Sequence, residues 1–110
     1  MEIAVNKVPD GVVIALAGRM DAVTAPKFDR VMDDLIARGE RRIVVDLKDL
    51  EYISSAGLQS ILAAAKRLEP EGGRIDLAAL QGPVFEVFDI SGFTSIFHIF
   101  DSPAAALQES

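Results

Sequence analysis

The chain has 110 residues, of which 50% are hydrophobic and 25% are charged, and its formal net charge is −6 at pH 7. This length suits one domain, and no apolar run approaches the roughly 18 residues of a membrane-spanning helix. Nucleic-acid binding is disfavoured because it needs clustered Lys and Arg, whereas the basic residues here are dispersed. The sequence has no cysteine, and it begins as an alternating strand rather than a signal peptide. We therefore expect a soluble cytoplasmic domain without membrane insertion.

Hydrophobic periodicity predicts strands and helices that alternate along most of the chain. Strands are indicated where apolar residues alternate or run continuously between turn residues, and helices where they recur every three or four positions. The predicted strands, in chain order, are residues 1–7, 12–17, 42–47, 74–80 and 95–100. The first two are joined by the turn Pro9-Asp10-Gly11 and therefore form a hairpin.

Four helices are expected between and after these strands. Their predicted starts are Thr24, the Ser54-Ser55 turn, Gly82-Pro83 and Pro103. In the first helix, Val23 and Phe28 have the spacing of a hydrophobic staple, and Gly39 ends the helix. The last helix is short, and either Asp101 or Ser102 caps it.

The alternation of strands and helices indicates the fold class. Parallel neighbours need crossover connections, which the intervening helices supply. We therefore predict an α/β fold with a single five-stranded, mostly parallel sheet, an N-terminal hairpin and about four helices. In such sheets, functional groups collect at the carboxyl ends of strands. Two such ends, residues 17–21 and the Ser54-Ser55 turn, are expected to lie close together.

The segment 52–58 places two serine hydroxyls at the start of a helix. Backbone N–H groups there lack helical partners and the helix dipole is positive, so a phosphate on Ser55 would be favoured. The simpler alternative is that Ser54 or Ser55 is only the N-cap of the helix. Gly57 costs about 1 kcal/mol relative to alanine in a helix, which suggests that some group approaches it closely.

Three segments of the chain resemble, in order and spacing, the landmarks of bacterial anti-sigma factor antagonists, the STAS domain. They are residues 16–21, 46–58 and 88–93. The resemblance covers roughly residues 2–108, which we expect to form one STAS domain with the STAS fold.

The resemblance implies a partner switch. In this family, the unphosphorylated antagonist binds a serine-kinase anti-sigma factor and thereby releases a sigma factor. The kinase phosphorylates the antagonist, which then dissociates, and a PP2C-type phosphatase resets it. The alternative is a STAS regulatory module with a non-sigma client, such as a transporter auxiliary subunit or another phospho-signalling partner.

The family's phosphoacceptor pattern, Asp-Ser-(Ser/Thr)-Gly-Leu, is anchored here on Gly57-Leu58. The acceptor is then Ser55, while Ser54 stands at the acidic position and Ala56 at the second hydroxyl position. Asp21 matches the acidic residue of the family's Gly-x-x-Asp loop, which contributes to partner recognition. The resemblance therefore implies these partner-binding residues: Gly18, Asp21, Ser54, Ser55, Ala56 and Gly57.

Catalytic and metal chemistry find little support in the sequence. His98 is the only histidine, which excludes a histidine-cluster metal site, and no cofactor is implied. We interpret His98 as an ordinary, partly buried strand residue. A hydrolase that combines Ser55, Asp21 and His98 is disfavoured because the histidine lies on a different strand edge. We therefore do not expect an enzyme.

Overall fold

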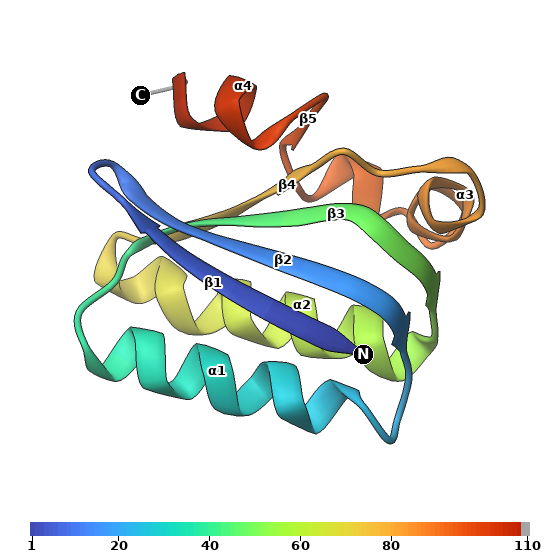
Figure 1. The fold of residues 1–110 in the computed structure, drawn as a ribbon, viewed down its shortest axis with the longest axis horizontal. Coiled ribbons are helices and arrows are strands. Elements are labelled where there is room, and N and C mark those ends of the chain that lie inside the picture. Colours follow the sequence, from blue (N-terminus) through green and yellow to red (C-terminus); the bar gives the residue numbers. More distant parts are fainter. Residues whose placement is uncertain (109–110) are drawn as a thin grey trace.

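Five strands form one sheet in the order β1-β2-β3-β4-β5 in the computed structural model, which describes residues 1–108 (Figure 1). The strands are β1 (Glu2–Val8), β2 (Gly11–Met20), β3 (Arg42–Ile53), β4 (Arg74–Ala78) and β5 (Ile99–Phe100). β1 and β2 pair antiparallel, and every other neighbouring pair is parallel. The predicted mixed sheet with an N-terminal hairpin is therefore confirmed.

The expected four helices are also present within residues 1–108. They are α1 (Ala25–Ala37), α2 (Ser55–Leu68), α3 (Gly82–Ile90) and α4 (Pro103–Gln108), and two short 3-10 turns are η1 (Glu69–Glu71) and η2 (Phe93–Ser95). Figure 1 shows α1 and α2 side by side on one face of the sheet, α4 on the opposite face, and α3 beside the end of β3. Ser102 caps α4, because its Oγ accepts a hydrogen bond from the Ala105 N–H at 3.1 Å.

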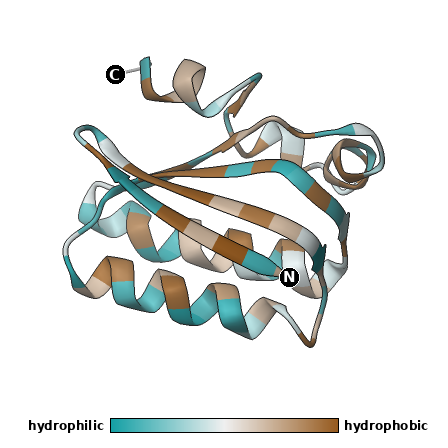
Figure 2. Ribbon diagram, in the orientation of Figure 1, coloured by the Kyte–Doolittle hydropathy of each residue, from teal (hydrophilic) through white to brown (hydrophobic). Residues whose placement is uncertain are grey.

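The main core lies between the sheet and the helices α1 and α2. Alternate residues of β2 point into it, as the twofold period of a strand requires, and Phe28 and Met32 of α1 and Ile61 of α2 face them. Figure 2 shows hydrophobic positions recurring along these helices and strands. A smaller cluster around Val44 and Ala106 holds α4 on the other face. The remainder of that face, near the carboxyl ends of β2 and β3, stays open.

β2 and β3 are longer than the sequence indicates. The apolar runs predict strands at 12–17 and 42–47, whereas the structure extends them to Met20 and Ile53. The pairing shifts register twice on the way, and each shift inserts one extra residue on β3. Such β-bulges bend a strand and interrupt its alternation. The charged residues within 48–51 are exposed, so they read as a loop in the sequence although they belong to a strand.

The predicted strand 95–100 is wrong over most of its length. Only the two residues of β5 pair with β4, and the residues before them form η2 and a helical turn. The Phe97 N–H donates to the Phe93 carbonyl oxygen at 3.1 Å, and the two rings lie 6.0 Å apart, both buried. Burying this pair of phenylalanines at i and i+4 requires a helical turn, which overrides the strand-like alternation.

Three smaller expectations are also wrong. His98 is exposed rather than partly buried. Val23 is 86% exposed, so it forms no staple with the buried Phe28. The strand predicted at 74–80 ends two residues early, because Ala79 has a φ of +59°, which is incompatible with an extended strand.

Candidate functional site

The two predicted strand ends adjoin. Met20 and Ile53 are register partners at the last paired position of β2 and β3. The Ser54 backbone N–H then donates to the Met20 carbonyl oxygen at 2.9 Å. Asp21 and Ser54 therefore leave the sheet side by side, and the loop before α1 lies next to the start of α2, as the sequence predicts.

The two serines have different roles at the start of α2. Ser54 is the N-cap: its backbone is extended, and its Oγ accepts a long hydrogen bond of 3.4 Å from the Gly57 N–H. Ser55 is the first residue of the helix and is exposed. The capping role therefore falls to Ser54, and the hydroxyl of Ser55 stands at the surface of the helix N-terminus.

Gly57 is buried against this chain's own strands. A Cβ at this position would lie 2.8 Å from Cγ1 of Ile53 and 3.0 Å from both Cγ and the carbonyl oxygen of Met20. The close approach that the sequence suggests thus comes from β2 and β3. Gly57 sets how near α2 begins to the sheet, and Ala56 beside it is half-buried.

Asp21 organises the loop between β2 and α1. Its Oδ1 accepts hydrogen bonds from the backbone N–H groups of Val23 at 3.0 Å and Thr24 at 3.1 Å. The hydrogen bond from the Thr24 N–H is the largest cause of a lowered pKa for the Asp21 carboxyl, assisted by the nearby Arg19 charge. Asp21 is therefore ionised at neutral pH, and it follows directly after Met20, whose carbonyl oxygen binds the Ser54 N–H.

Thr24 does not cap α1 with its side chain, contrary to the expectation from its position. Its Oγ1 instead accepts from the Asp21 N–H at 2.8 Å and donates to the Arg19 carbonyl oxygen at 2.9 Å. These reciprocal bonds between Asp21 and Thr24 replace a capping box and fix the loop in one shape.

The sequence did not predict the contact between Arg19 and Tyr52 at the same end of the sheet. The Arg19 guanidinium carbon lies 4.1 Å from the centroid of the Tyr52 ring, a distance typical of a cation–π interaction. Both side chains are exposed. Counting straight along the strands from the pair Ala15 and Asp46 would place Arg19 beside Leu50, whereas the two bulges move its partner to Tyr52. The sequence offers no sign of either bulge.

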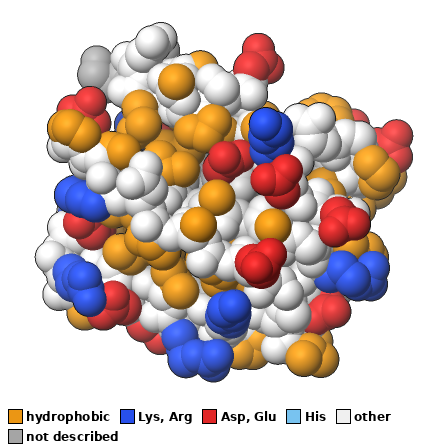
Figure 3. All heavy atoms as spheres, viewed as in Figure 1, with side chains coloured by type: hydrophobic (Ala, Val, Ile, Leu, Met, Phe, Trp, Pro, Cys, Tyr) orange, Lys and Arg blue, Asp and Glu red, His pale blue; other side chains and the backbone are white. Residues whose placement is uncertain are grey.

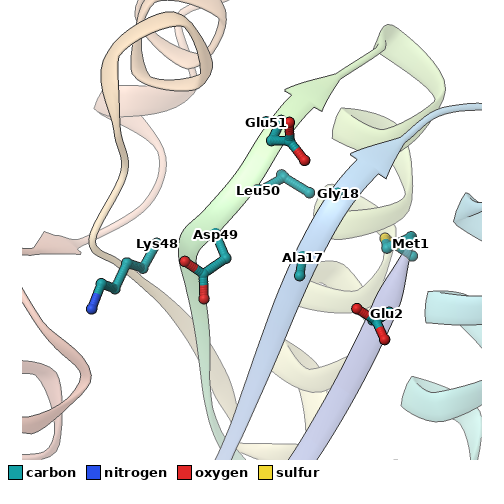
Figure 4. Close-up of a pocket in the computed structure, with 8 residues that line it drawn as sticks. All are labelled: Met1, Glu2, Ala17, Gly18, Lys48, Asp49, Leu50 and Glu51. Carbon is teal, nitrogen blue, oxygen red and sulfur yellow. The ribbon is translucent and has the colours of Figure 1, made fainter.

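Gly18, also predicted to bind a partner, lies two residues before the end of β2. Its φ is +93°, and it borders a hollow of about 620 Å³ on the open face of the sheet. The carboxylates of Glu2, Asp49 and Glu51 surround this hollow (Figure 4), and in Figure 3 acidic side chains gather over β2 and β3. Neither Ser55 nor Asp21 lines it.

His98 is not brought to the serines. It lines a cavity with Leu62 and Lys66 from the second half of α2. At 1.5 Å per residue, these lie about 10–17 Å along the helix from Ser55. Within residues 1–108, no cluster of three or more His, Cys, Asp or Glu side chains is arranged to hold a metal ion. Among the helices of residues 1–108, none combines the length and the hydrophobicity of a membrane-spanning segment.

The family model of the STAS domain matches residues 2–106. The anti-sigma F factor antagonist of Paenibacillus polymyxa is 33% identical over 88% of this chain and 84% of that protein. The chain belongs to the STAS domain family of anti-sigma factor antagonists. The resemblance drawn from the three sequence landmarks is thereby confirmed, and this family is regulatory rather than catalytic.

Other comparisons agree with this membership. BtrV of Bordetella bronchiseptica is 42% identical over 96% of this STAS chain and 91% of BtrV. The crystal structure of a Thermotoga maritima protein superposes with a TM-score of 0.91 at 25% identity, over 97% of this chain and 92% of that one. The phosphorylated form of SpoIIAA from Bacillus superposes with a TM-score of 0.77 at 22% identity, over 97% of both chains, and therefore shows the shared fold.

Proposed function

We propose that this STAS domain protein is an anti-sigma factor antagonist switched by phosphorylation of Ser55. The unphosphorylated form binds a serine-kinase anti-sigma factor and so releases a sigma factor. The kinase transfers phosphate to Ser55, the complex dissociates, and a PP2C-type phosphatase restores the active form. The observation that carries the proposal is the exposed Ser55 hydroxyl at the first position of α2, beside the Asp21 loop and free of the capping role that Ser54 performs.

The free protein can tolerate a phosphate on Ser55. Phosphorylation adds about −1.5 to −2 charge at pH 7. At the N-terminus of α2 this charge faces the positive end of the helix dipole and N–H groups that lack helical partners. Because Ser55 is exposed, the phosphate remains hydrated and no packed group has to move. The fold should therefore survive the modification.

The same charge is costly in a complex. If the partner covers Ser55, an unpaired charge in the interface costs on the order of 3–5 kcal/mol. At 1.4 kcal/mol per tenfold, this weakens binding roughly 10²- to 10³-fold or more. Asp21 already places a negative charge next to the site, and the protein carries a net charge of −6. A phosphate on Ser55 therefore adds negative charge to a surface that is already acidic.

A capture experiment from the native cell extract tests the proposal. Immobilised wild type and Ser55→Ala should retain a serine-kinase anti-sigma factor, and Ser55→Asp should lose it. Ser95→Asp is a matched control, because it adds the same charge at another exposed serine. Retention of the kinase by Ser55→Asp would contradict the switch. Loss of a different partner by Ser55→Asp alone would keep the switch and identify a non-sigma client.

A further inference from the structure

We propose that the stacked pair Arg19 and Tyr52 is an anchor of the partner interface, in which Arg19 binds a carboxylate of the partner and Tyr52 positions its guanidinium. This inference rests on the proposed function, because the partner is the anti-sigma factor kinase that covers Ser55. It adds the chemistry of one contact: an acidic side chain on the kinase, seated against an arginine and a tyrosine of the antagonist.

The sheet geometry places this pair at the edge of the switch. Arg19 comes two residues before Asp21, and Tyr52 comes three before Ser55, at the carboxyl ends of adjacent parallel strands. Their following neighbours in the strands are buried in the main core. Successive side chains of a strand point to opposite faces, so Arg19 and Tyr52 stand on the open face. A partner that covers Ser55 and the Asp21 loop therefore contacts the pair at the edge of the covered surface.

The Arg19 guanidinium lies over a ring without a direct ion pair to a carboxylate of residues 1–108, although its charge acts on the nearby Asp21 carboxyl. The Tyr52 ring supports one face at 4.1 Å, and the Arg19 carbonyl oxygen is fixed by the Thr24 hydroxyl at 2.9 Å. None of the ion pairs within residues 1–108 includes Arg19. A guanidinium stacked on its face still presents its N–H groups along its edges, in the geometry that binds a carboxylate through two hydrogen bonds.

Such a pair has the properties of a binding hot spot. Arginine and tyrosine are enriched among the few residues that carry most of the energy of an interface. Because Arg19 is already ordered by the ring, binding loses less side-chain freedom than it would with a flexible arginine. Tyr52 is 39% exposed, so part of its ring remains available for the partner to cover.

The anti-sigma factor kinase is first purified by affinity capture on immobilised wild-type protein. Calorimetric titration with this kinase then tests the contact. We expect Arg19→Gln and Tyr52→Leu each to weaken binding at least about tenfold, as hot-spot losses do. Tyr52→Phe keeps the ring and should bind within about twofold of wild type, which separates positioning by the ring from a role of the hydroxyl. Arg38→Gln is the matched control, since Arg38 is an exposed arginine at the end of α1. Thermal melts check that each variant is folded.

A spectroscopic measurement follows Tyr52 directly. It is the only tyrosine in the chain, so labelling with 3-fluorotyrosine gives a single ¹⁹F signal. This signal should shift in Arg19→Gln as the cation leaves the ring, and it should shift again when the kinase is added to wild type. An unchanged signal at saturating kinase would show that the pair lies outside the interface and would overturn the proposal.

The Ser55→Asp variant separates this inference from the proposed function. If Ser55→Asp binds the kinase as wild type does, the proposed switch fails. If Ser55→Asp loses binding while Arg19→Gln and Tyr52→Leu bind as wild type, only the anchor fails. Failure of the anchor alone is also the result expected if Arg19 binds the phosphate on Ser55 instead of a carboxylate of the partner.

Discussion

The backbone N–H of Ser54 donates to the carbonyl oxygen of Met20 at 2.9 Å, and this bond joins the two halves of the candidate site. It continues the pairing of β2 with β3 by one residue beyond the strand ends. Asp21 and Ser55 follow its two partners in the chain, so the proposed recognition loop and the proposed phosphoacceptor are fixed at the same end of the sheet. A partner that contacts one of them is thereby brought to the other.

Ser54 and Ser55 should differ in their effect on stability. Ser54→Ala removes the N-cap of α2, and such losses cost typically about 1 kcal/mol in the free energy of unfolding. For a chain of this size, that corresponds to a fall of about 4 °C in Tm. Ser55→Ala places a good helix former at an exposed helical position and should leave stability nearly unchanged. Thermal melts of the two variants test this, and an equal fall in both would show that the capping role is shared.

Gly57→Ala should destabilise the domain although alanine favours helices. The new Cβ would lie 2.8 Å from Ile53 Cγ1 and 3.0 Å from the Met20 carbonyl oxygen. Such overpacking costs about 1–3 kcal/mol, which outweighs the gain of about 1 kcal/mol in helix propensity. Urea unfolding of Gly57→Ala should show the loss. Gln59→Ala is the control, because Gln59 is exposed on the same helix. Equal stability of Gly57→Ala and wild type would mean that α2 can move outward freely.

The sequence predicted the parts of the fold that depend on local patterns. Apolar alternation and turn residues found the hairpin and the alternation of strands with helices, and the topology then placed Asp21 beside Ser54. It missed what depends on long-range packing. The bulges that pair Arg19 with Tyr52 leave no local pattern, and the burial of Phe93 with Phe97 replaced a strand-like alternation with a helical turn. The choice between Ser54 and Ser55 as cap also required the backbone geometry.

Asp21 should contribute to stability in a pH-dependent way. Its folded-state pKa is lowered from 3.8, chiefly by the hydrogen bond from the Thr24 N–H. A lowered carboxyl pKa stabilises the fold above the unfolded value, and this contribution is lost as the pH falls through the folded value. Asp21→Asn keeps an oxygen acceptor but cannot titrate. The difference in Tm between wild type and Asp21→Asn should therefore be constant at neutral pH and change below about pH 4.

The same Asp21→Asn variant should bind the kinase more weakly than wild type at neutral pH, because the loop keeps its shape while its negative charge is lost. Asp21→Ala is the companion variant, since it also removes the acceptor for the Val23 and Thr24 N–H groups. Phosphorylation of Asp21→Asn at the wild-type rate would exclude a role for the charge in recognition.

Asp76 should matter for stability and not for the switch. It is 1% exposed, and its Oδ2 lies 3.3 Å from Arg42 Nη2 and 3.2 Å from Arg74 Nε. Arg42 also donates to the Ala106 carbonyl oxygen in α4. Asp76→Asn removes the negative charge that lies close to both arginines. The expected loss in the free energy of unfolding is about 1–3 kcal/mol, and it is not larger because both arginines can rehydrate in part. Urea unfolding should show this loss, while kinase affinity of the folded variant stays at the wild-type value.

Two substitutions of Ser55 separate the effect of charge on partner binding from the effect of side-chain shape. Ser55→Ala keeps the site small and neutral, so it should bind the anti-sigma factor kinase about as tightly as wild type and act as a permanently active antagonist. Ser55→Asp adds a negative charge at the start of α2, where the helix dipole favours it by roughly 0.3–1 kcal/mol. This variant should therefore be folded, with a Tm at or slightly above that of wild type, and yet bind weakly.

Stability and affinity thus move in opposite directions at Ser55, whereas Ser54→Ala removes the N-cap of α2 and should lower stability. Parallel thermal melts and calorimetric titrations measure both quantities for the same samples. If Ser55→Asp bound as tightly as Ser55→Ala, electrostatic exclusion at Ser55 would not be the switch, and the partner would have to sense the serine by its shape alone.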